Sequence, residues 1–327
     1  MPDSPEPELS RTLSAKPPSR LWLLLRRLLV LGFFVLIVWL LVSRTQAIDW
    51  SEVWVALQAL GTPVLLASLL LSLLSYALYG GYDLFARHYT RQSLPKSLTA
   101  SIAAICYAFN LNMGAWLGGI GLRYRLYSRF GVERGTITRI VGLSLVTNWS
   151  GYCLLAGIAG SFGFVDLPDG GRIGDLGLRL IGFALLLGVT SYVALCGVSR
   201  RRSFSLRGTT VTLPSLRMAV AQIALSVANW MTMGLIVYLL LGAEIAYPTV
   251  LAVLLLSGIA GAVAHVPAGL GVVEAVFLAL LGDAMADTEL LAGLLAYRAV
   301  YYIAPLALAA LGFAFVEALA RRRPIRA

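Results

Sequence analysis

The chain has 327 residues, of which 59% are hydrophobic and only 13% are charged, and its mean hydropathy is +0.82. This composition excludes an ordinary soluble domain, because such a domain needs more polar surface to face water. The net charge of +10 raises the question of nucleic-acid binding, but the charges lie in intervals between long apolar segments. That placement indicates membrane topology, so we expect a membrane as partner and no nucleic acid.

The N-terminal residues 1–20 are rich in Pro and Ser and lack apolar periodicity, which predicts a disordered cytoplasmic tail. The apolar run that follows, 21–42, is too long for the core of a signal peptide and is predicted to be a retained first span. We expect a single membrane domain over residues 21–320 and a short basic cytoplasmic tail at 321–327.

Eight apolar segments follow one another along the chain, each near or above the roughly 20 residues that cross a hydrocarbon core. They cover residues 21–42, 62–86, 97–122, 139–161, 178–199, 216–241, 249–282 and 290–319. This pattern predicts an all-α polytopic membrane protein.

The intervals between these segments are sorted by charge. The basic intervals are 87–96, 123–139, 200–217 and 321–326, and the acidic ones are 49–52, 166–175, 244 and 283–289. The positive-inside rule places the basic intervals in the cytoplasm. Segments 97–122 and 249–282 each have the same kind of interval at both ends, so we predict two re-entrant helical hairpins and six full spans, with both termini inside. A simple count gives eight helices instead.

With this topology the two halves of the membrane domain form an inverted repeat. Residues 21–161 and 178–319 both read span, span, hairpin, span, but they begin on opposite sides of the membrane. Glycine allows the positive φ angles and close backbone contacts that a hairpin tip needs. The tip residues are Gly118, Gly119 and Gly121 in the first hairpin and Pro267, Gly269 and Gly271 in the second. Irregular backbone at membrane depth requires protein or a water-filled cavity around it, so the tips indicate a functional site.

Ionisable residues within apolar segments are few, and such residues are usually functional. Glu274 follows Gly271 by three residues, in the first turn of a predicted helix, where a carboxylate caps exposed N–H groups. Arg298 lies near the middle of the last segment. We predict an ion pair between Glu274 and Arg298 that closes the second hairpin, with a structural and a gating role both open.

The first hairpin returns through a basic and aromatic stretch that contains Arg123, Arg125 and Tyr127. Arginine binds phosphate with two donors and tyrosine suits the head-group zone, so a phospholipid head group is the expected partner. An ordinary basic loop is the alternative. Asp83 can pair with Arg87, four residues on, or meet a cationic head group.

No metal, cofactor or hydrolytic motif stands out. The cysteines, Cys106, Cys153 and Cys196, lie singly in apolar segments, as expected for packed core residues. The two histidines, His88 and His265, are far apart, and we expect His265 to be a packed polar residue near the second tip. We therefore expect no cofactor, no metal and no catalytic residue.

Three stretches carry a resemblance to a known family. They are Gly119–Tyr127 (GIGLRYRLY), Ala264–Leu278 (AHVPAGLGVVEAVFL) and Ala296–Pro305 (AYRAVYYIAP). Together they resemble the membrane domain of lysylphosphatidylglycerol synthase/flippase proteins and of their stand-alone YbhN-like relatives, over about residues 20–320. Ala268 departs from the second glycine usual at that tip.

The resemblance implies lipid translocation in a bacterial inner membrane, with Arg123, Arg125, Glu274 and Arg298 as the best-placed residues. The chain ends at Ala327 without the synthase domain of two-part relatives, so we expect no aminoacyltransferase activity. The expected partner is a phospholipid with an anionic or aminoacylated head group. Alternatives are an accessory protein that acts with a separate synthase, a lipid-modifying enzyme that uses Glu274, and a homo-oligomer.

Overall fold

The computed structural model describes residues 50–164, 174–199, 203–206, 209–264 and 266–322. The predicted tail at 1–20, the first predicted span at 21–42, and His265 lie outside the described residues. Residues 321 and 322, placed in the C-terminal tail by sequence, continue the last helix, and the remainder of that tail is not described.

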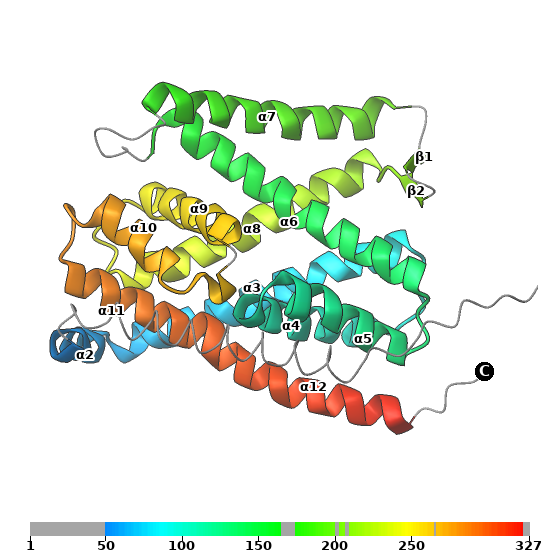
Figure 1. The fold of residues 1–327 in the computed structure, drawn as a ribbon, viewed down its shortest axis with the longest axis horizontal. Coiled ribbons are helices and arrows are strands. Elements are labelled where there is room, and N and C mark those ends of the chain that lie inside the picture. Colours follow the sequence, from blue (N-terminus) through cyan, green and yellow to red (C-terminus); the bar gives the residue numbers. More distant parts are fainter. Residues whose placement is uncertain (1–49, 165–173, 200–202, 207–208, 265, 323–327) are drawn as a thin grey trace, which may run out of the picture. The chain divides into compact units, whose positions relative to one another are not determined.

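The described part of the chain consists mainly of helices (Figure 1). In chain order they are α2 (Trp50–Ala59), α3 (Thr62–Tyr89), α4 (Lys96–Met113), the π-helix η1 (Ala115–Gly121), α5 (Leu122–Arg129), α6 (Arg134–Phe162), α7 (Asp175–Val198), α8 (Leu216–Leu240), α9 (Tyr247–Ala264), the 3₁₀ helix η2 (Pro267–Gly269), α10 (Val272–Leu281), α11 (Asp287–Tyr297), the π-helix η3 (Arg298–Ile303) and α12 (Ala304–Arg322).

Five of these helices are long and apolar enough to cross a membrane, by length and composition, within the described residues. They are α3, α6, α7, α8 and the continuous run Asp287–Ala320 formed by α11, η3 and α12. They coincide with five of the six predicted full spans, so the prediction of an all-α polytopic membrane protein is confirmed.

The ends of the long helices follow from local sequence. α3 begins after Gly61 with a proline in its first turn, where a missing N–H costs nothing. Ser215 caps α8, since its side chain accepts a hydrogen bond from the Met218 N–H at 3.3 Å. α6 ends at Phe162 and is followed by Gly163, whose φ of 66° is the left-handed conformation that glycine adopts at helix C-termini.

Both segments expected to form hairpins are broken in the structure. α4 ends before Gly114, which has a φ of 84°, and the chain returns through η1 against α4 and into α5. α9 ends at Ala264, and the chain returns as α10, which packs beside α9 (Figure 1). α4 also contacts η2, so the two hairpins meet. Their depth in a membrane and the inverted repeat remain predictions.

One element was not predicted. A short antiparallel pair of strands, β1 (Ser203–Leu206) and β2 (Thr209–Thr212), lies in the basic interval between α7 and α8. Ser203 pairs with Thr212 and Leu206 with Thr209. The threonines and valine of β2 favour extended backbone, which explains a strand pair here.

The helices α3, α6 and α8 pack against one another, and α4 packs on α3 (Figure 1). α12 covers α4, and α7 packs mainly on α6. Large apolar side chains of α7, among them Leu176, Leu187 and Val198, are exposed, as expected for a helix that faces lipid. The broken hairpins therefore lie beside a closely packed group of long helices.

Candidate functional site

Asp83 in α3 is fully buried and holds the first hairpin through two residues of α5. Arg123 Nε donates to Asp83 Oδ2 at 3.1 Å and Nη2 donates to Oδ1 at 3.2 Å. The Tyr127 hydroxyl donates to Oδ2 at 2.9 Å. Arg123 also donates to the Gly119 carbonyl at 3.2 Å, and its guanidinium carbon lies 5.6 Å from the centre of the Tyr79 ring. The carboxylate and the guanidinium are therefore both compensated inside the protein.

These contacts correct part of the sequence interpretation. Asp83 does not pair with Arg87, whose Nε donates instead to the Leu94 carbonyl. Asp83 lies on the fully buried face of α3, where Arg123 reaches it from the neighbouring hairpin. A cationic head group at Asp83, or a lipid phosphate at Arg123, requires this pair to open.

Glu274 and Arg298 form the predicted ion pair across the second hairpin. Arg298 Nη2 donates to Glu274 Oε2 at 2.9 Å, and Nε donates to Oε1. Oε2 also accepts the Gly271 N–H at 2.9 Å, so Glu274 caps α10 as well. Arg298 further donates to the carbonyls of Ala268 and Gly269, both at 3.1 Å. One arginine therefore holds the hairpin tip and the start of α10 together.

The π-helix η3 begins at Arg298 and is bound by side chains from the first half of the chain. The Tyr76 hydroxyl donates to the Tyr301 carbonyl at 3.2 Å, and Asn112 Nδ2 donates to the Tyr302 carbonyl at 3.3 Å. Short π-helical segments are uncommon and occur often at functional sites. Here the segment connects α3, the first hairpin and the second ion pair.

A buried polar network beside η3 was missed by the sequence analysis. The Ser75 hydroxyl donates to Asn229 Oδ1 at 2.7 Å and lies 2.6 Å from the Tyr301 hydroxyl, which lies 2.9 Å from the Tyr107 hydroxyl. The network joins α3, α4, α8 and η3. The sequence does contain a pattern that could have indicated this network. Ser68, Ser72 and Ser75 lie on one face of α3, as their spacing of three and four residues shows.

Arg125 belongs to a third charged cluster, at the contact of α5 with α12. Glu317 Oε1 lies 2.9 Å from Arg129 Nη2 and 3.5 Å from Arg125 Nη2. Both arginine side chains are about half exposed, whereas Glu317 is buried. Arg125 also lies over the Phe313 ring, 5.3 Å from its centre. Arg125 was predicted from its basic and aromatic stretch, whereas Glu317 was not predicted, because a carboxylate beside the basic residues 321–326 has no local signal.

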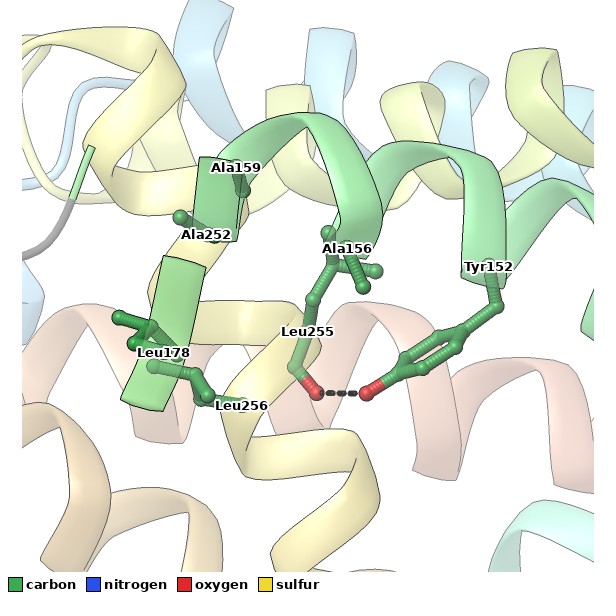
Figure 2. Close-up of a pocket in the computed structure, with 8 residues that line it drawn as sticks. Tyr152, Ala156, Ala159, Leu178, Ala252, Leu255 and Leu256 are labelled. Atoms are coloured by element: carbon green, nitrogen blue, oxygen red, sulfur yellow. Dashed lines mark hydrogen bonds between the residues drawn. The ribbon is translucent and has the colours of Figure 1, made fainter. Parts of the chain in front are cut away.

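A separate cavity of about 40 Å³ lies between α6, α7 and α9 (Figure 2). Its walls are small or apolar, and the Tyr152 hydroxyl beside it donates to the Leu255 carbonyl at 2.8 Å. The cavity therefore offers space for apolar groups and no charge. Within the described ranges, no group of three metal-ligating side chains comes together.

Long apolar helices beside two broken hairpins, each held by an arginine–carboxylate pair, define a polytopic helical membrane protein. A family model described as the lysylphosphatidylglycerol synthase TM region matches residues 26–309. The chain belongs to this family, as the resemblance of its three motifs indicated.

Two relatives align over almost the whole chain. The inner membrane protein YbhN of Escherichia coli is 44% identical, over 92% of this chain and 95% of the relative. A protein of Synechocystis, slr0712, is 30% identical, over 90% of this chain and 92% of the relative.

Proposed function

We propose that this protein moves phospholipids between the leaflets of a bacterial inner membrane. The observation that supports this proposal best is the placement of two arginine–carboxylate pairs that hold two broken helical hairpins, which contact each other. Charged residues within membrane segments are costly and usually take part in function. Membership of a family named for a lipid, lysylphosphatidylglycerol, agrees with it.

In this proposal the half-exposed Arg125 and Arg129 meet the lipid phosphate first, since Arg123 is fully engaged with Asp83. The two buried pairs act as gates. When a pair opens, its arginine exchanges a carboxylate for the lipid phosphate, so that no guanidinium is left uncompensated in the bundle. The lipid carries an anionic or aminoacylated head group, and both termini of the chain face the cytoplasm. A separate synthase or a second copy of the chain are further partners in this scheme.

The proposal includes no catalytic step. Glu274 is the carboxylate expected to serve a lipid-modifying enzyme, but both of its oxygens accept hydrogen bonds, from Arg298 and from the Gly271 N–H. A general acid or base needs an oxygen within reach of the substrate proton. The arrangement of Glu274 suits a gate better than a catalyst.

The test is transbilayer movement of head-group-labelled phospholipids in proteoliposomes that contain only the purified protein. Glu274→Gln removes one charge of the second pair, and we expect it to change the rate of transport by about tenfold or more, because a buried pair that loses one partner leaves an uncompensated charge. Glu289→Gln, on an exposed residue of the first turn of α11, is the matched control and should transport normally.

Two results argue against this proposal. Normal transport by folded Glu274→Gln protein removes the gating role of the pair. Failure of the unaltered protein to move any lipid removes the transport function and favours an accessory role beside a separate synthase.

A further inference from the structure

The cluster formed by Arg125, Arg129 and Glu317 has an unbalanced set of hydrogen bonds. Both guanidinium groups approach the same oxygen, Oε1 of Glu317, at 3.5 and 2.9 Å. Oε2 of the same carboxylate is buried and has no hydrogen-bond partner among the described residues. Glu317 as a whole is only 7% exposed. A buried carboxylate oxygen without a donor is costly, so this atom indicates a missing partner with positive charge and N–H groups.

The two arginines of the cluster also lack a second anionic partner. Two guanidinium groups and one carboxylate sum to a charge of +1, and both arginine side chains are about half exposed. A guanidinium has five N–H donors, and the contacts to Glu317 use few of them. Arginine side chains with free donors at a membrane surface bind phosphate groups with two hydrogen bonds.

The surface of α12 next to this cluster is apolar. Leu308, Leu311 and Phe315 are all more than half exposed, at spacings of three and four residues. These spacings place them on one face of the helix. Glu317 follows Phe315 by two residues, so it lies on the opposite side of α12 from the stripe and is buried. The stripe therefore indicates that α12 faces the acyl chains of the bilayer, and it is not part of the charged cluster.

We propose that the contact of α5 with α12 is a head-group site for a phospholipid that carries a primary ammonium, of the phosphatidylethanolamine class. Its phosphate binds Arg125 and Arg129, its ammonium donates to Glu317 Oε2, and its acyl chains remain in the bilayer that α12 faces. This inference rests on the proposed function and adds a zwitterionic head group to the anionic and aminoacylated ones proposed there for the lipid that enters the transport path.

The contact distances explain how the ammonium reaches a buried oxygen. Arg125 Nη2 lies 3.5 Å from Glu317, at the limit of a hydrogen bond, whereas Arg129 is held at 2.9 Å. Arg125 is the more exposed of the two arginines. When Arg125 turns toward the lipid phosphate, it uncovers the Oε1 side of the carboxylate, and the ammonium enters past Oε1 to reach Oε2.

Lipid binding to the purified full-length chain, measured by native mass spectrometry in detergent, tests this site. Three lipids with identical dioleoyl chains are compared. Phosphatidylethanolamine has an ammonium with N–H donors, phosphatidylcholine has the same charge without donors, and phosphatidylglycerol has hydroxyl donors but no positive charge. We expect the ethanolamine lipid to bind about fivefold more tightly than the choline lipid, as one charge-assisted hydrogen bond in a partly exposed site allows. Soluble glycerophosphoethanolamine, added in excess, should compete poorly, because it lacks the acyl chains.

Glu317→Gln should abolish the preference for ethanolamine over choline and leave phosphatidylglycerol binding equal or stronger, because the arginines keep their charge. Arg129→Gln should weaken all three lipids. Glu244→Gln and Arg134→Gln, both on exposed residues outside the cluster, are the matched controls and should behave like the unaltered chain. Thermal unfolding of each variant separates loss of binding from loss of folding.

The outcomes distinguish this site from the wider proposal. Equal binding of ethanolamine and choline lipids, or a preference that persists in folded Glu317→Gln protein, overturns the ammonium site while lipid transport stands. Effective competition by the soluble head group overturns a lipid-specific site. If the binding preference follows the expected pattern but no lipid moves in proteoliposomes, the head-group site stands and the transport function fails.

Discussion

The two hairpins of this protein are stabilised in the same way, but with the charges exchanged. In the first, the arginine comes from the hairpin, as Arg123, and the carboxylate from a neighbouring helix, as Asp83. In the second, the carboxylate comes from the hairpin, as Glu274, and the arginine from the following helix, as Arg298. Both hairpins therefore have an ion pair with a neighbouring helix, but the hairpin supplies the arginine in the first pair and the carboxylate in the second.

In both hairpins the arginine also binds backbone carbonyls at the tip. Arg123 donates to Gly119, and Arg298 donates to Ala268 and Gly269. A broken helix leaves carbonyls without partners, which is expensive where no water is present. A guanidinium has enough donors for a carboxylate and a carbonyl together. Arg298 therefore caps the broken backbone of the second tip in addition to carrying a charge, whereas Arg123 binds a carbonyl inside the run of η1 and α5.

The hairpins differ in burial and in backbone conformation. The first pair is almost fully enclosed, whereas the side chains of Glu274 and Arg298 are 15% and 11% exposed. The second tip contains three residues with positive φ, namely Ala268, Gly269 and Gly271. We infer that the first hairpin is the firmer of the two and that the second moves more easily. Four substitutions sharpen this difference.

The largest effect is expected for Asp83→Asn. It leaves Arg123 charged in a buried site, which should lower the free energy of unfolding by about 3–5 kcal/mol. Glu274→Gln should cost less, because its pair is closer to solvent. Thermal unfolding of the purified protein in detergent gives both values.

The double variant Asp83→Leu with Arg123→Met is the control for this result. It removes both charges at once, so it should be more stable than Asp83→Asn alone. Equal losses for Asp83→Asn and Glu274→Gln would contradict the idea that the first hairpin is the firmer one.

A smaller effect is expected for Gly118→Ala at the first tip. A Cβ atom at this position would lie 2.2 Å from the carbonyl carbon and oxygen of Phe109, so the backbone of η1 or of α4 must move. Overpacking of this kind costs about 1–3 kcal/mol. Gly135→Ala is the matched control, since no atom lies within 4 Å of the added Cβ there. A midpoint of unfolding that is unchanged in Gly118→Ala would show that the two arms of the first hairpin are not closely packed.

The sequence predicted the helices well because long apolar runs and charge sorting are local signals. The five described spans and the two broken segments lie where those signals placed them. The Glu274–Arg298 pair was predictable too. Both residues are among the few charges that lie inside the apolar segments of residues 178–319, and each was a reasonable partner for the other. The membrane depth of the hairpins remains a prediction, since charge sorting alone supports it.

Other contacts depend on how distant helices pack, which no local pattern encodes. Arg123 and Asp83 are 40 residues apart, and Arg125 and Glu317 are 192 apart. The helix spacing between Asp83 and Arg87 suggested a local pair, but tertiary packing gave Asp83 a buried partner with two donors. The tyrosine and serine network beside η3 joins four elements that are separated in the sequence. Each residue of this network, considered alone, resembles an ordinary core residue, so the sequence does not indicate that they contact one another.

Ala268 offers the smallest and most specific comparison of the two tips. It has a φ of 59° and a ψ of 6°, a left-handed conformation that costs an L-residue roughly 1–2 kcal/mol. Ala268→Gly removes this strain but increases the conformational freedom of the unfolded chain, so we expect a net gain of about 0.5 kcal/mol in the free energy of unfolding. Ala262→Gly, on the exposed surface of α9, is the matched control and should lose about 1 kcal/mol. If both variants lose the same amount in thermal unfolding, Ala268 is not strained, and the second tip then owes its mobility to the exposure of its ion pair alone.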